Sequence, residues 1–197
     1  MSRIKKLELD DWDKELREMT AADSGTPLEQ GAMRMFAHTP EISKGLTTFA
    51  GSLKQNRSLP DRLVELVRLR VAFHNQCRSC MAIRYKDGQE DGITEDLVCS
   101  LEKPMEAENL SDAEKAAIHY GELFATNHLA INDETYNNLR KYFSESEIVE
   151  LSMTVAFFVG FGRLAASYHM VEELPESFQA NEEETLTPWG NDSIIVR

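Results

Sequence analysis

Apolar residues recur at helical spacing along most of the chain. In residues 63–71 they fall at i, i+3, i+4 and i+8, on one face of a helix, and residues 113–124 repeat this pattern. Residues 148–164 are apolar on nearly every side, which is typical of a buried central helix. We find no convincing run that alternates between apolar and polar positions. The sequence therefore predicts an all-α fold.

The residues at the expected helix starts agree with this pattern. Pro40 and Pro60 suit the beginning of a helix, where a missing backbone N–H costs nothing. Ser111 and Ser144 each begin an S-x-x-E capping box, and Thr94 is a further predicted cap. Residues 64–73 also resemble residues 149–157, so an ancient duplication of a helical unit and chance similarity both remain open.

The chain is expected to form a single helical domain over residues 1–174, followed by an arm. Residues 175–197 lose the helical periodicity and gain acidic residues. Docking on the body, docking on a neighbouring subunit and partial disorder all remain open for this arm. Its apolar residues available for docking are Trp189, Ile194, Ile195 and Val196.

The net charge of the chain indicates which classes of partner it is not expected to bind. The net charge is -13, from 34 acidic and 21 basic residues. Such a surface repels phosphate backbones and anionic lipid, so we expect neither nucleic acid nor a membrane as a partner. The sequence has no apolar run of membrane-spanning length and begins with no secretory pattern, which predicts a cytoplasmic location. An odd cysteine count of three favours a reducing compartment.

Two of the cysteines, Cys77 and Cys80, form a C-x-x-C pair that different chemistries could use. A structural zinc site needs four ligands, but Cys99 is isolated. His119, His128 and His169 form no pair with ligand spacing. A thioredoxin-type motif follows a strand, which the helical flanks disfavour. A metal site and a thioredoxin fold are therefore both disfavoured.

A redox couple at the start of a helix is the favoured interpretation of Cys77 and Cys80. Residues i and i+3 share a helix face, so the two sulfurs can form a disulfide, and unpaired N–H groups at a helix start stabilise a thiolate. Simple burial remains the alternative for the pair, and burial is the prediction for Cys99. Glu65 lies on a polar stripe, where an ion pair with Arg62 or Arg68 would also explain it.

The spacing Glu65-(11 residues)-Cys77-x-x-Cys80, within LVELVRLRVAFHNQCRSCMAIRY, resembles the carboxymuconolactone decarboxylase superfamily. The alkylhydroperoxidase D-like branch is the most similar. The later segments LSDAEKAAIHYGELFATN and FSESEIVELSMTVAFFVGFGRLA extend the resemblance, which covers roughly residues 40–170.

This resemblance implies an alkylhydroperoxidase D-like helical bundle that assembles as a homo-oligomer, a trimer or hexamer. It implies antioxidant thiol peroxidase or disulfide reductase chemistry with no haem, metal or other cofactor. Cys80 would be the peroxidatic cysteine, Cys77 the resolving cysteine and Glu65 the base of a proton relay. The substrate would be a hydroperoxide, and the reductant a dithiol protein or a lipoyl-type thiol.

The sequence departs from the family pattern at two positions. Arg84 stands where the relay histidine is expected, and Ser79 replaces a residue that is often histidine. An arginine cannot pass on a proton at neutral pH, but one helical turn below Cys80 it would favour a thiolate. His74 or Tyr85 would then carry the proton, although His74 is also explained as a helix-end histidine bonded to a carbonyl.

Two further hypotheses remain. A non-redox enzyme related to the decarboxylase branch would use Glu65, His74 and Arg84 to handle a small carboxylated or lactone substrate. A binding or structural oligomer would leave the cysteines as redox sensors or without a role. In every redox version the helix must break near residues 74–76, because a straight helix turns Cys77 away from Glu65.

Overall fold

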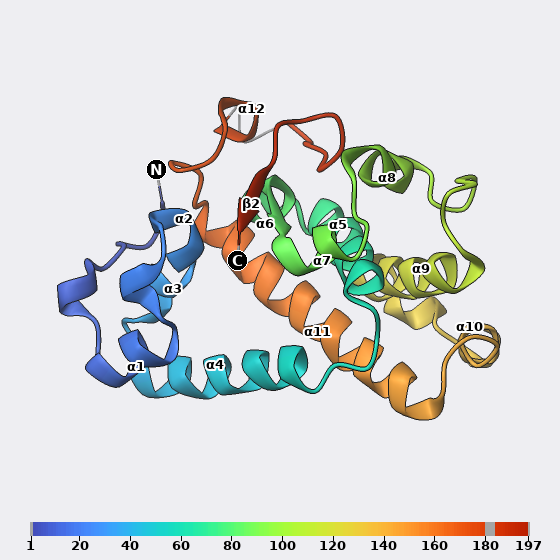
Figure 1. Cartoon of the computed structure of the whole chain (residues 1–197), viewed down its shortest axis with the longest axis horizontal. Coiled ribbons are helices and arrows are strands. Elements are labelled where there is room, and N and C mark those ends of the chain that lie inside the picture. The colour runs from blue at the N-terminus through green and yellow to red at the C-terminus, as the bar shows by residue number, and fades with distance from the viewer. Residues whose placement is uncertain (1, 180–183, 197) are drawn as a thin grey trace.

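The computed structural model describes residues 2–179 and 184–196, and its regular structure is almost entirely helical (Figure 1). The fold is all-α, as the sequence predicted. The first part of the chain contains four helices and two short 3-10 turns, at Leu9–Asp11 and Ala22–Ser24. The helices are α1 (Lys14–Met19), α2 (Pro27–Gln30), α3 (Met33–Phe36) and α4 (Pro40–Gln55).

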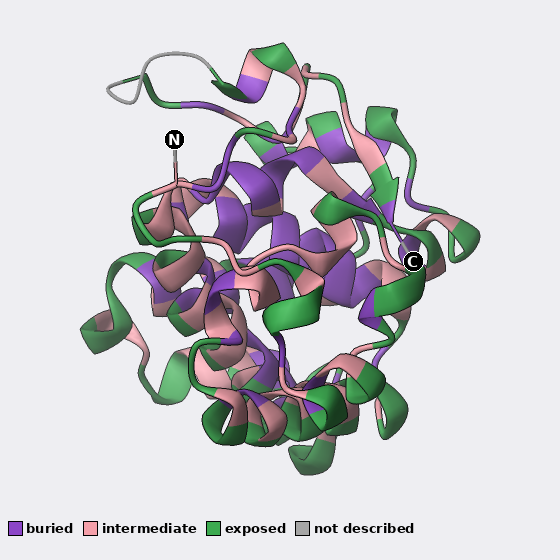
Figure 2. Ribbon diagram, turned by 90° about the vertical axis from the view of Figure 1, so that its left-hand side faces the viewer, coloured by how far each residue is buried: buried purple, intermediate pink, exposed green. Residues whose placement is uncertain are grey.

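The centre of the molecule is α5 (Asp61–Asn75), which packs against both α9 (Asp112–Thr126) and α11 (Glu145–Tyr168). Its buried positions include Leu66, Leu69 and Val71, none of which is exposed to solvent. Figure 2 shows these buried positions concentrated in the middle of the molecule, with exposed positions on the outer ribbons. Hydrophobic burial of this central helix is therefore the main contribution to the fold.

Shorter elements surround the central helices. They are α6 (Arg78–Ala82), β1 (Ile83–Tyr85), α7 (Lys86–Glu90), α8 (Glu95–Cys99), α10 (Asp133–Leu139), α12 (Glu176–Gln179) and β2 (Ile194–Val196), with 3-10 turns at Ser100–Glu102 and His128–Ala130.

The predicted helix starts are confirmed. Ser111 and Ser144 both form complete capping boxes, in which each hydroxyl accepts a backbone N–H and a glutamate binds back to the cap. The side chain of Thr94 caps α8. Pro40 is the first residue of α4, and Pro60 directly precedes α5.

The C-terminal arm docks on the body of its own chain. Its last described residues form β2, which pairs in parallel with β1, beside the C-x-x-C segment (Figure 1). The ring of Trp189 lies 4.9 Å from that of Phe73, centroid to centroid. These two short strands were not predicted from the sequence. Residues 180–183 and 197 of the expected arm lie outside the described residues.

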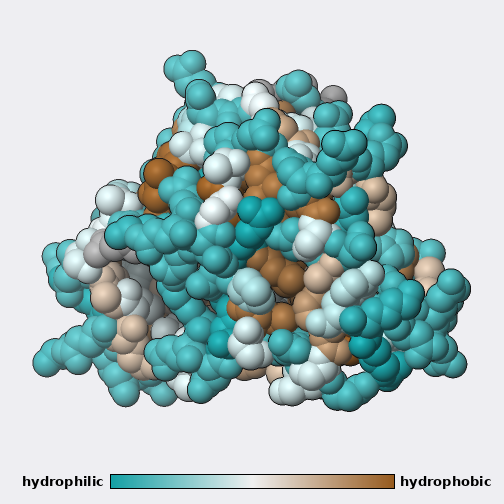
Figure 3. All heavy atoms as spheres, turned by 45° about the vertical axis from the view of Figure 1, so that its right-hand side comes forward, coloured by the Kyte–Doolittle hydropathy of each residue, from teal (hydrophilic) through white to brown (hydrophobic). Residues whose placement is uncertain are grey.

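Helix α11 combines length with an apolar composition. Within the described part of the chain it is the one helix that could cross a membrane by these two criteria, which buried core helices also meet. It packs against α5 and α9, and 39% of its apolar 18-residue stretch is buried. Hydrophilic side chains cover most of the face drawn in Figure 3, with apolar atoms visible in hollows between them.

The end of α5 is held against α11 by a close contact that requires glycine. Asn75 donates from Nδ2 to the carbonyl of Phe158 at 3.0 Å and accepts from Arg163 Nε at 3.1 Å. A Cβ added to Gly162 would lie 2.5 Å from that Asn75 Nδ2. The amide, pinned at both ends, cannot move aside without losing these bonds.

We expect Gly162→Ala to lower the free energy of unfolding by about 1–3 kcal/mol, as overpacking does. The matched control is Gly160→Ala on the same helix, where an added Cβ meets no atom within 4 Å. That change should stabilise the protein by up to about 1 kcal/mol through helix propensity. Urea unfolding measures both, and equal effects of the two variants would contradict the packing argument.

Candidate functional site

The chain reverses direction between α5 and α6. Helix α5 ends at Asn75, Gln76 takes the left-handed conformation (φ 49°, ψ 37°), and Cys77 caps α6. The Gln76 side chain donates to the Leu186 carbonyl at 3.1 Å and accepts the Leu186 N–H at 2.9 Å. These two bonds from the arm stabilise a conformation that is uncommon for a residue with a Cβ. The predicted break near residues 74–76 is confirmed.

Cys77 and Cys80 are joined by a disulfide, with their Cα atoms 5.2 Å apart. The two residues differ in exposure, since Cys77 is fully buried and Cys80 is partly exposed. The sulfur of Cys77 accepts the N–H of Cys80 at 3.4 Å and lies 3.6 Å from the hydroxyl of Ser79. The pair is thus an inner and an outer sulfur at the start of α6.

The outer sulfur belongs to a residue that faces a cavity of about 160 Å³. Cys80 lines this cavity, whereas Cys77 does not. Most of the wall is apolar, and its polar contributions come from Arg68, Asn75 and Tyr85. The aromatic part of the wall consists of Phe36, Phe157, Phe158 and Phe161.

Glu65 and Arg68 form a buried, two-pronged ion pair beside the disulfide. Arg68 Nε lies 2.7 Å from Glu65 Oε2, and Arg68 Nη2 lies 2.7 Å from Glu65 Oε1. Both side chains are almost completely buried: Arg68 is 6% exposed and Glu65 is 4% exposed. The carboxylate also accepts the N–H of Tyr85 at 3.3 Å. The ion pair considered from the sequence is therefore present, with Arg68 as the partner of Glu65.

Arg68 connects this pair to the C-x-x-C helix. Its Nη1 donates to the Cys80 carbonyl at 2.6 Å, and its Nη2 donates to the Ile83 carbonyl at 2.9 Å. Burial works against the charge of Arg68, but the Glu65 carboxylate raises the pKa of Arg68 above its ordinary value. The guanidinium also lies 4.8 Å from the centre of the Tyr85 ring. A permanently charged group thus fixes the backbone on which Cys80 stands.

A second hollow, of about 240 Å³, lies on the Glu65 side of this ion pair. It shares Arg68, Tyr85, Phe157 and Phe158 with the Cys80 cavity. Gly88 closes one wall, since a Cβ there would lie 3.0 Å from Glu65 Cγ. Glycine at this position lets α7 approach the carboxylate closely.

Arg84 is completely buried and points toward the arm. Its guanidinium pairs with both carboxylate oxygens of Glu95 at 3.0 Å and donates to the Pro188 carbonyl at 2.6 Å. Helix α6 ends at Ala82, so Arg84 lies on β1. The expectation that Arg84 lies one helical turn below Cys80 is therefore wrong, because the helix stops before that turn is complete.

His74 lies away from the Cys80 cavity. Its Nε2 is 3.1 Å from Glu122 Oε1, which also accepts from Arg70 at 2.6 Å. The hydrogen bond from His74, followed by that from Arg70, outweighs burial and lowers the pKa of Glu122 to about 2. The sequence suggested a carbonyl as the partner of a helix-end histidine, and the structure has this carboxylate instead.

The structure brings Glu65 and Cys80 together through Arg68, and it separates His74 and Arg84 from them. Neither His74 nor Arg84 lines the cavity. The catalytic roles predicted for His74 and Arg84 stay predictions. The non-redox hypothesis requires Glu65, His74 and Arg84 to bind one substrate together, and the structure does not bring these three side chains to one site. Cys99 is exposed, so the prediction that it is buried is wrong: it ends α8 on the outer side.

Arg68 takes part in the site, whereas the sequence indicated it only as one of two possible ion-pair partners of Glu65. The available signal was an arginine three residues after Glu65, within a helix that is otherwise apolar on several sides. A charge at such a position is buried only when it is paired. Within residues 2–179 and 184–196, no group of three or more His, Cys, Asp or Glu side chains is arranged to hold a metal ion.

The structure is thus that of an all-helical protein with a C-x-x-C disulfide at the edge of a cavity. Residues 40–123, which contain this pair and Glu65, match the carboxymuconolactone decarboxylase family. The resemblance stated from the sequence is therefore confirmed for this segment, which carries the site.

Solved structures share the fold over most of the chain. The alkylhydroperoxidase AhpD core of an uncharacterized peroxidase-related protein from Ralstonia eutropha is 17% identical, with a TM-score of 0.70, and the match covers 90% of this chain and 94% of that one. A putative antioxidant defence protein AhpD from Agrobacterium tumefaciens is 21% identical, with a TM-score of 0.58, over 70% and 93% of the two chains. At these identities the likeness establishes an alkylhydroperoxidase D-like fold.

Curated relatives match over shorter segments. The uncharacterized protein YdfG of Bacillus subtilis is 28% identical over 92 residues, which are 46% of this chain and 63% of that protein. The uncharacterized protein Rv2313c of Mycobacterium tuberculosis is 29% identical over 121 residues, 60% of this chain and 42% of that protein. The matches thus span less than two thirds of these relatives' own lengths.

Arg84 is expected to act mainly by holding the arm. Arg84→Lys keeps the charge but loses the planar fork, and it should lower the free energy of unfolding by about 1.5–3 kcal/mol. Limited proteolysis should also cut the arm sooner. Arg140→Lys is the control: Arg140 is exposed and pairs with Glu145 at 2.6 Å. If Arg84→Lys were as stable and as protease-resistant as this control, the assigned role would be wrong.

The hydrogen bonds from His74 and Arg70 to Glu122 predict how the stability of the protein depends on pH. Because folding lowers the pKa of Glu122 from 4.5 to about 2, its stabilising contribution is complete above 4.5 and disappears as the pH falls through 2. Glu122→Gln should therefore destabilise the protein at pH 7, by about 1–3 kcal/mol, and by progressively less in acid. Unfolding of the parent and of Glu122→Gln between pH 7 and pH 2 measures the difference in their free energies of unfolding.

The exposed Glu108 supplies the control, since Glu108→Gln should change stability by no more than about 0.5 kcal/mol. If the difference in free energy of unfolding between the parent and Glu122→Gln stayed constant from pH 7 to pH 2, the stabilising role of the ionised Glu122 would be ruled out.

Proposed function

We propose that this protein is a thiol-dependent peroxidase, or disulfide oxidoreductase, that uses Cys80 and Cys77 as its redox pair. The observation that carries this proposal is the asymmetry of the pair. Cys80 faces a cavity of about 160 Å³, while Cys77 is buried behind it within disulfide-bonding distance. A reacting sulfur needs access to substrate, and a resolving sulfur needs access only to its partner.

The proposed reaction balances without a cofactor. The Cys80 thiolate attacks the terminal oxygen of the hydroperoxide, the O–O bond breaks, and the alkoxide takes up a proton to become an alcohol. The sulfenic acid on Cys80 is then attacked by the Cys77 sulfur, which forms the disulfide and releases water. A dithiol reductant restores both thiols by exchange and becomes a disulfide itself.

The surroundings of Cys80 favour this chemistry. Arg68 lines the cavity wall and donates to the carbonyl of Cys80. Its guanidinium lies nearer to the cavity of Cys80 than the Glu65 carboxylate, which does not line that cavity, so the positive end of the ion pair is the one that a Cys80 thiolate would meet. Of the two residues suggested for proton transfer in place of the missing histidine, Tyr85 lines the cavity and His74 does not. We therefore assign the phenol of Tyr85 as the group that returns a proton to the alkoxide.

The role of Glu65 in this proposal is to hold Arg68. Both of its carboxylate oxygens are engaged by the guanidinium, so its interaction with Cys80 passes through Arg68. The resemblance to the family implies that Glu65 acts as a base. To accept a proton, one of its carboxylate oxygens would have to leave its hydrogen bond with Arg68 during the reaction. A homo-oligomer, a dithiol protein as reductant and a cytoplasmic location complete the proposal.

Peroxide oxidation of the reduced protein tests this function. One equivalent of hydroperoxide should yield a product lighter by two hydrogens, with Cys77 and Cys80 joined. Cys80→Ser should consume no peroxide. Cys77→Ser should consume one equivalent and stop at a sulfenic acid, which dimedone traps on Cys80. Intact-protein and peptide mass spectrometry measure all three.

The third cysteine offers a matched control. Cys99 is a free, exposed thiol outside the pair, so Cys99→Ser should behave as the parent protein does. Peroxide consumption by Cys80→Ser at the parental rate would overturn the proposal, as would loss of the reaction in Cys99→Ser alone.

A further inference from the structure

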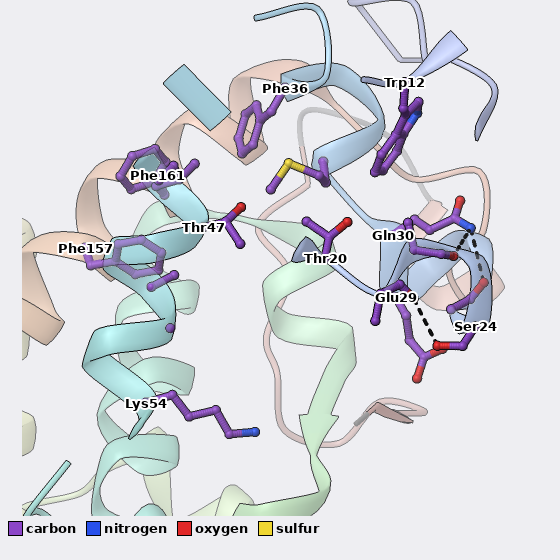
Figure 4. A pocket seen from close by; sticks show the side chains of 17 residues that line it. Trp12, Thr20, Ser24, Glu29, Gln30, Phe36, Thr47, Lys54, Phe157 and Phe161 are labelled. Atoms are coloured by element: carbon purple, nitrogen blue, oxygen red, sulfur yellow. Dashed lines mark hydrogen bonds between the residues drawn. The ribbon is translucent and has the colours of Figure 1, made fainter. Parts of the chain in front are cut away.

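The two sulfurs of the disulfide differ in how a reductant can reach them. Cys80 lines the cavity of about 160 Å³, whereas Cys77 is completely buried. The larger pocket of about 580 Å³ between the N-terminal helices and α11 includes neither cysteine in its lining. Figure 4 shows that pocket, and its rings Phe36, Phe157 and Phe161 also line the cavity of Cys80. A thiol that attacks the disulfide therefore reaches Cys80 through its cavity.

The enclosed sulfur of Cys77 lies within reach of two hydrogen-bond donors. The N–H of Cys80 is 3.4 Å from it, and the hydroxyl of Ser79 is 3.6 Å from it. Because a disulfide sulfur carries no proton, the hydroxyl is the donor in the second contact. Within residues 2–179 and 184–196, this hydroxyl has no other hydrogen-bond partner, and no donor bonds the Cys80 sulfur. The donors are thus gathered at the Cys77 end of the disulfide.

Ser79 also connects Cys77 to polar surroundings. Its side chain is largely buried and lines a hollow of about 290 Å³ that includes neither cysteine. The described lining of this hollow contains the polar residues Gln76, Ser167 and Thr185 and the charged residues Arg3, Arg78 and Glu184. The wall of the Cys80 cavity is mostly apolar. A negative charge that forms on Cys77 therefore meets a hydroxyl with polar groups behind it.

We propose that Ser79 is the positioning residue that makes Cys77 the leaving group when a dithiol reductant attacks the disulfide at Cys80. This inference rests on the disulfide oxidoreductase function proposed above and assigns the order of its reductive half. The contact from Ser79 to a disulfide sulfur is long and weak, but a thiolate is a charged acceptor and binds the same hydroxyl more strongly. A thiolate that is stabilised in this way leaves faster.

The reductive half balances in two exchanges. The thiolate of the reductant attacks the sulfur of Cys80, the bond between the cysteine sulfurs breaks, and its electron pair goes to Cys77 as a thiolate. The second thiol of the reductant then loses its proton and attacks the reductant sulfur of the mixed disulfide, which releases Cys80 as a thiolate. The reductant leaves as a disulfide, and the two cysteines take up the two protons that it has lost.

The rate at which dithiothreitol reduces the disulfide tests this role. Ser79→Ala removes the hydroxyl, and it should slow reduction by about fivefold to tenfold, the effect of one lost hydrogen bond. Ser79→Thr keeps a hydroxyl on the same carbon and should restore a rate close to that of the parent. Mass spectrometry of alkylated samples, quenched at successive times, measures the rates. Unfolding would expose the disulfide and speed its reduction, so a slower rate cannot come from a misfolded variant.

Ser167→Ala is the matched control. Ser167 lines the same hollow, but its hydroxyl donates to the Leu164 carbonyl at 2.7 Å, so this variant should be reduced at the parental rate. Reduction of Ser79→Ala at the parental rate would overturn the inference. Equal slowing in Ser79→Ala and Ser167→Ala, or in Ser79→Ala and Ser79→Thr, would also overturn it.

The sulfur that is attacked can be identified with sulfite. This small nucleophile splits a disulfide into one S-sulfonate and one thiolate, and iodoacetamide in denaturant then alkylates the thiolate. Trypsin cleaves after Arg78 and so places Cys77 and Cys80 in separate peptides. We expect the sulfonate on Cys80 and the alkyl group on Cys77. The reverse pattern would show that Cys80 is the leaving group and would make the proposal wrong.

Neither measurement uses a peroxide, so the outcomes for this inference and for the proposed peroxidase are separate. If the parent consumes no hydroperoxide but Ser79→Ala still slows reduction, the peroxidase function fails and the role of Ser79 is supported. If the parent consumes hydroperoxide and Ser79→Ala is reduced at the parental rate, the peroxidase function is supported and the role of Ser79 is wrong.

Discussion

The buried ion pair between Glu65 and Arg68 is the constraint on which the site depends. Two charges on adjacent turns of the central helix can be buried there only because they neutralise each other. Once paired, Arg68 still has donors left, and it uses them on the carbonyls of Cys80 and Ile83. The central helix α5 therefore sets the position of α6, which carries Cys80.

A second constraint is the reversal of the chain at Gln76. The left-handed residue turns α6 back across α5, and the arm holds that turn through Leu186. The arm also binds Arg84 through Pro188, and β2 pairs with β1. The disulfide thus lies at the start of α6, which is held by the core on one side and by the C-terminal arm on the other. This arrangement leaves Cys80 open to the cavity and Cys77 enclosed.

Local signals in the sequence were sufficient for the helices. The capping boxes at Ser111 and Ser144 bring together residues three positions apart, so their geometry follows from sequence alone. The break before Cys77 could be inferred because a straight helix would separate Glu65 from the cysteines. These features depend on neighbours along the chain, and the structure agrees with each of them.

Long-range contacts were not predictable in the same way. The partner of Arg84 at Pro188 is 104 residues away, in a segment without periodicity, and the exposure of Cys99 depends on which side of α8 faces the core. The pocket under the N-terminal helices required the relative placement of α1 to α4 and α11. A pattern of apolar residues indicates that a face is covered, but it does not say by what.

Competitive alkylation distinguishes Cys80, the proposed reacting sulfur, from the other two thiols of the chain. The fully reduced protein is treated with a limiting amount of iodoacetamide at neutral pH, and the labelled thiols are mapped by peptide mass spectrometry. Exposed Cys99 serves as the internal standard for an ordinary accessible thiol. We expect Cys80 to be labelled before Cys99, and Cys77 to be labelled last. Labelling of Cys77 before Cys80, or of Cys99 before either, would contradict this expectation.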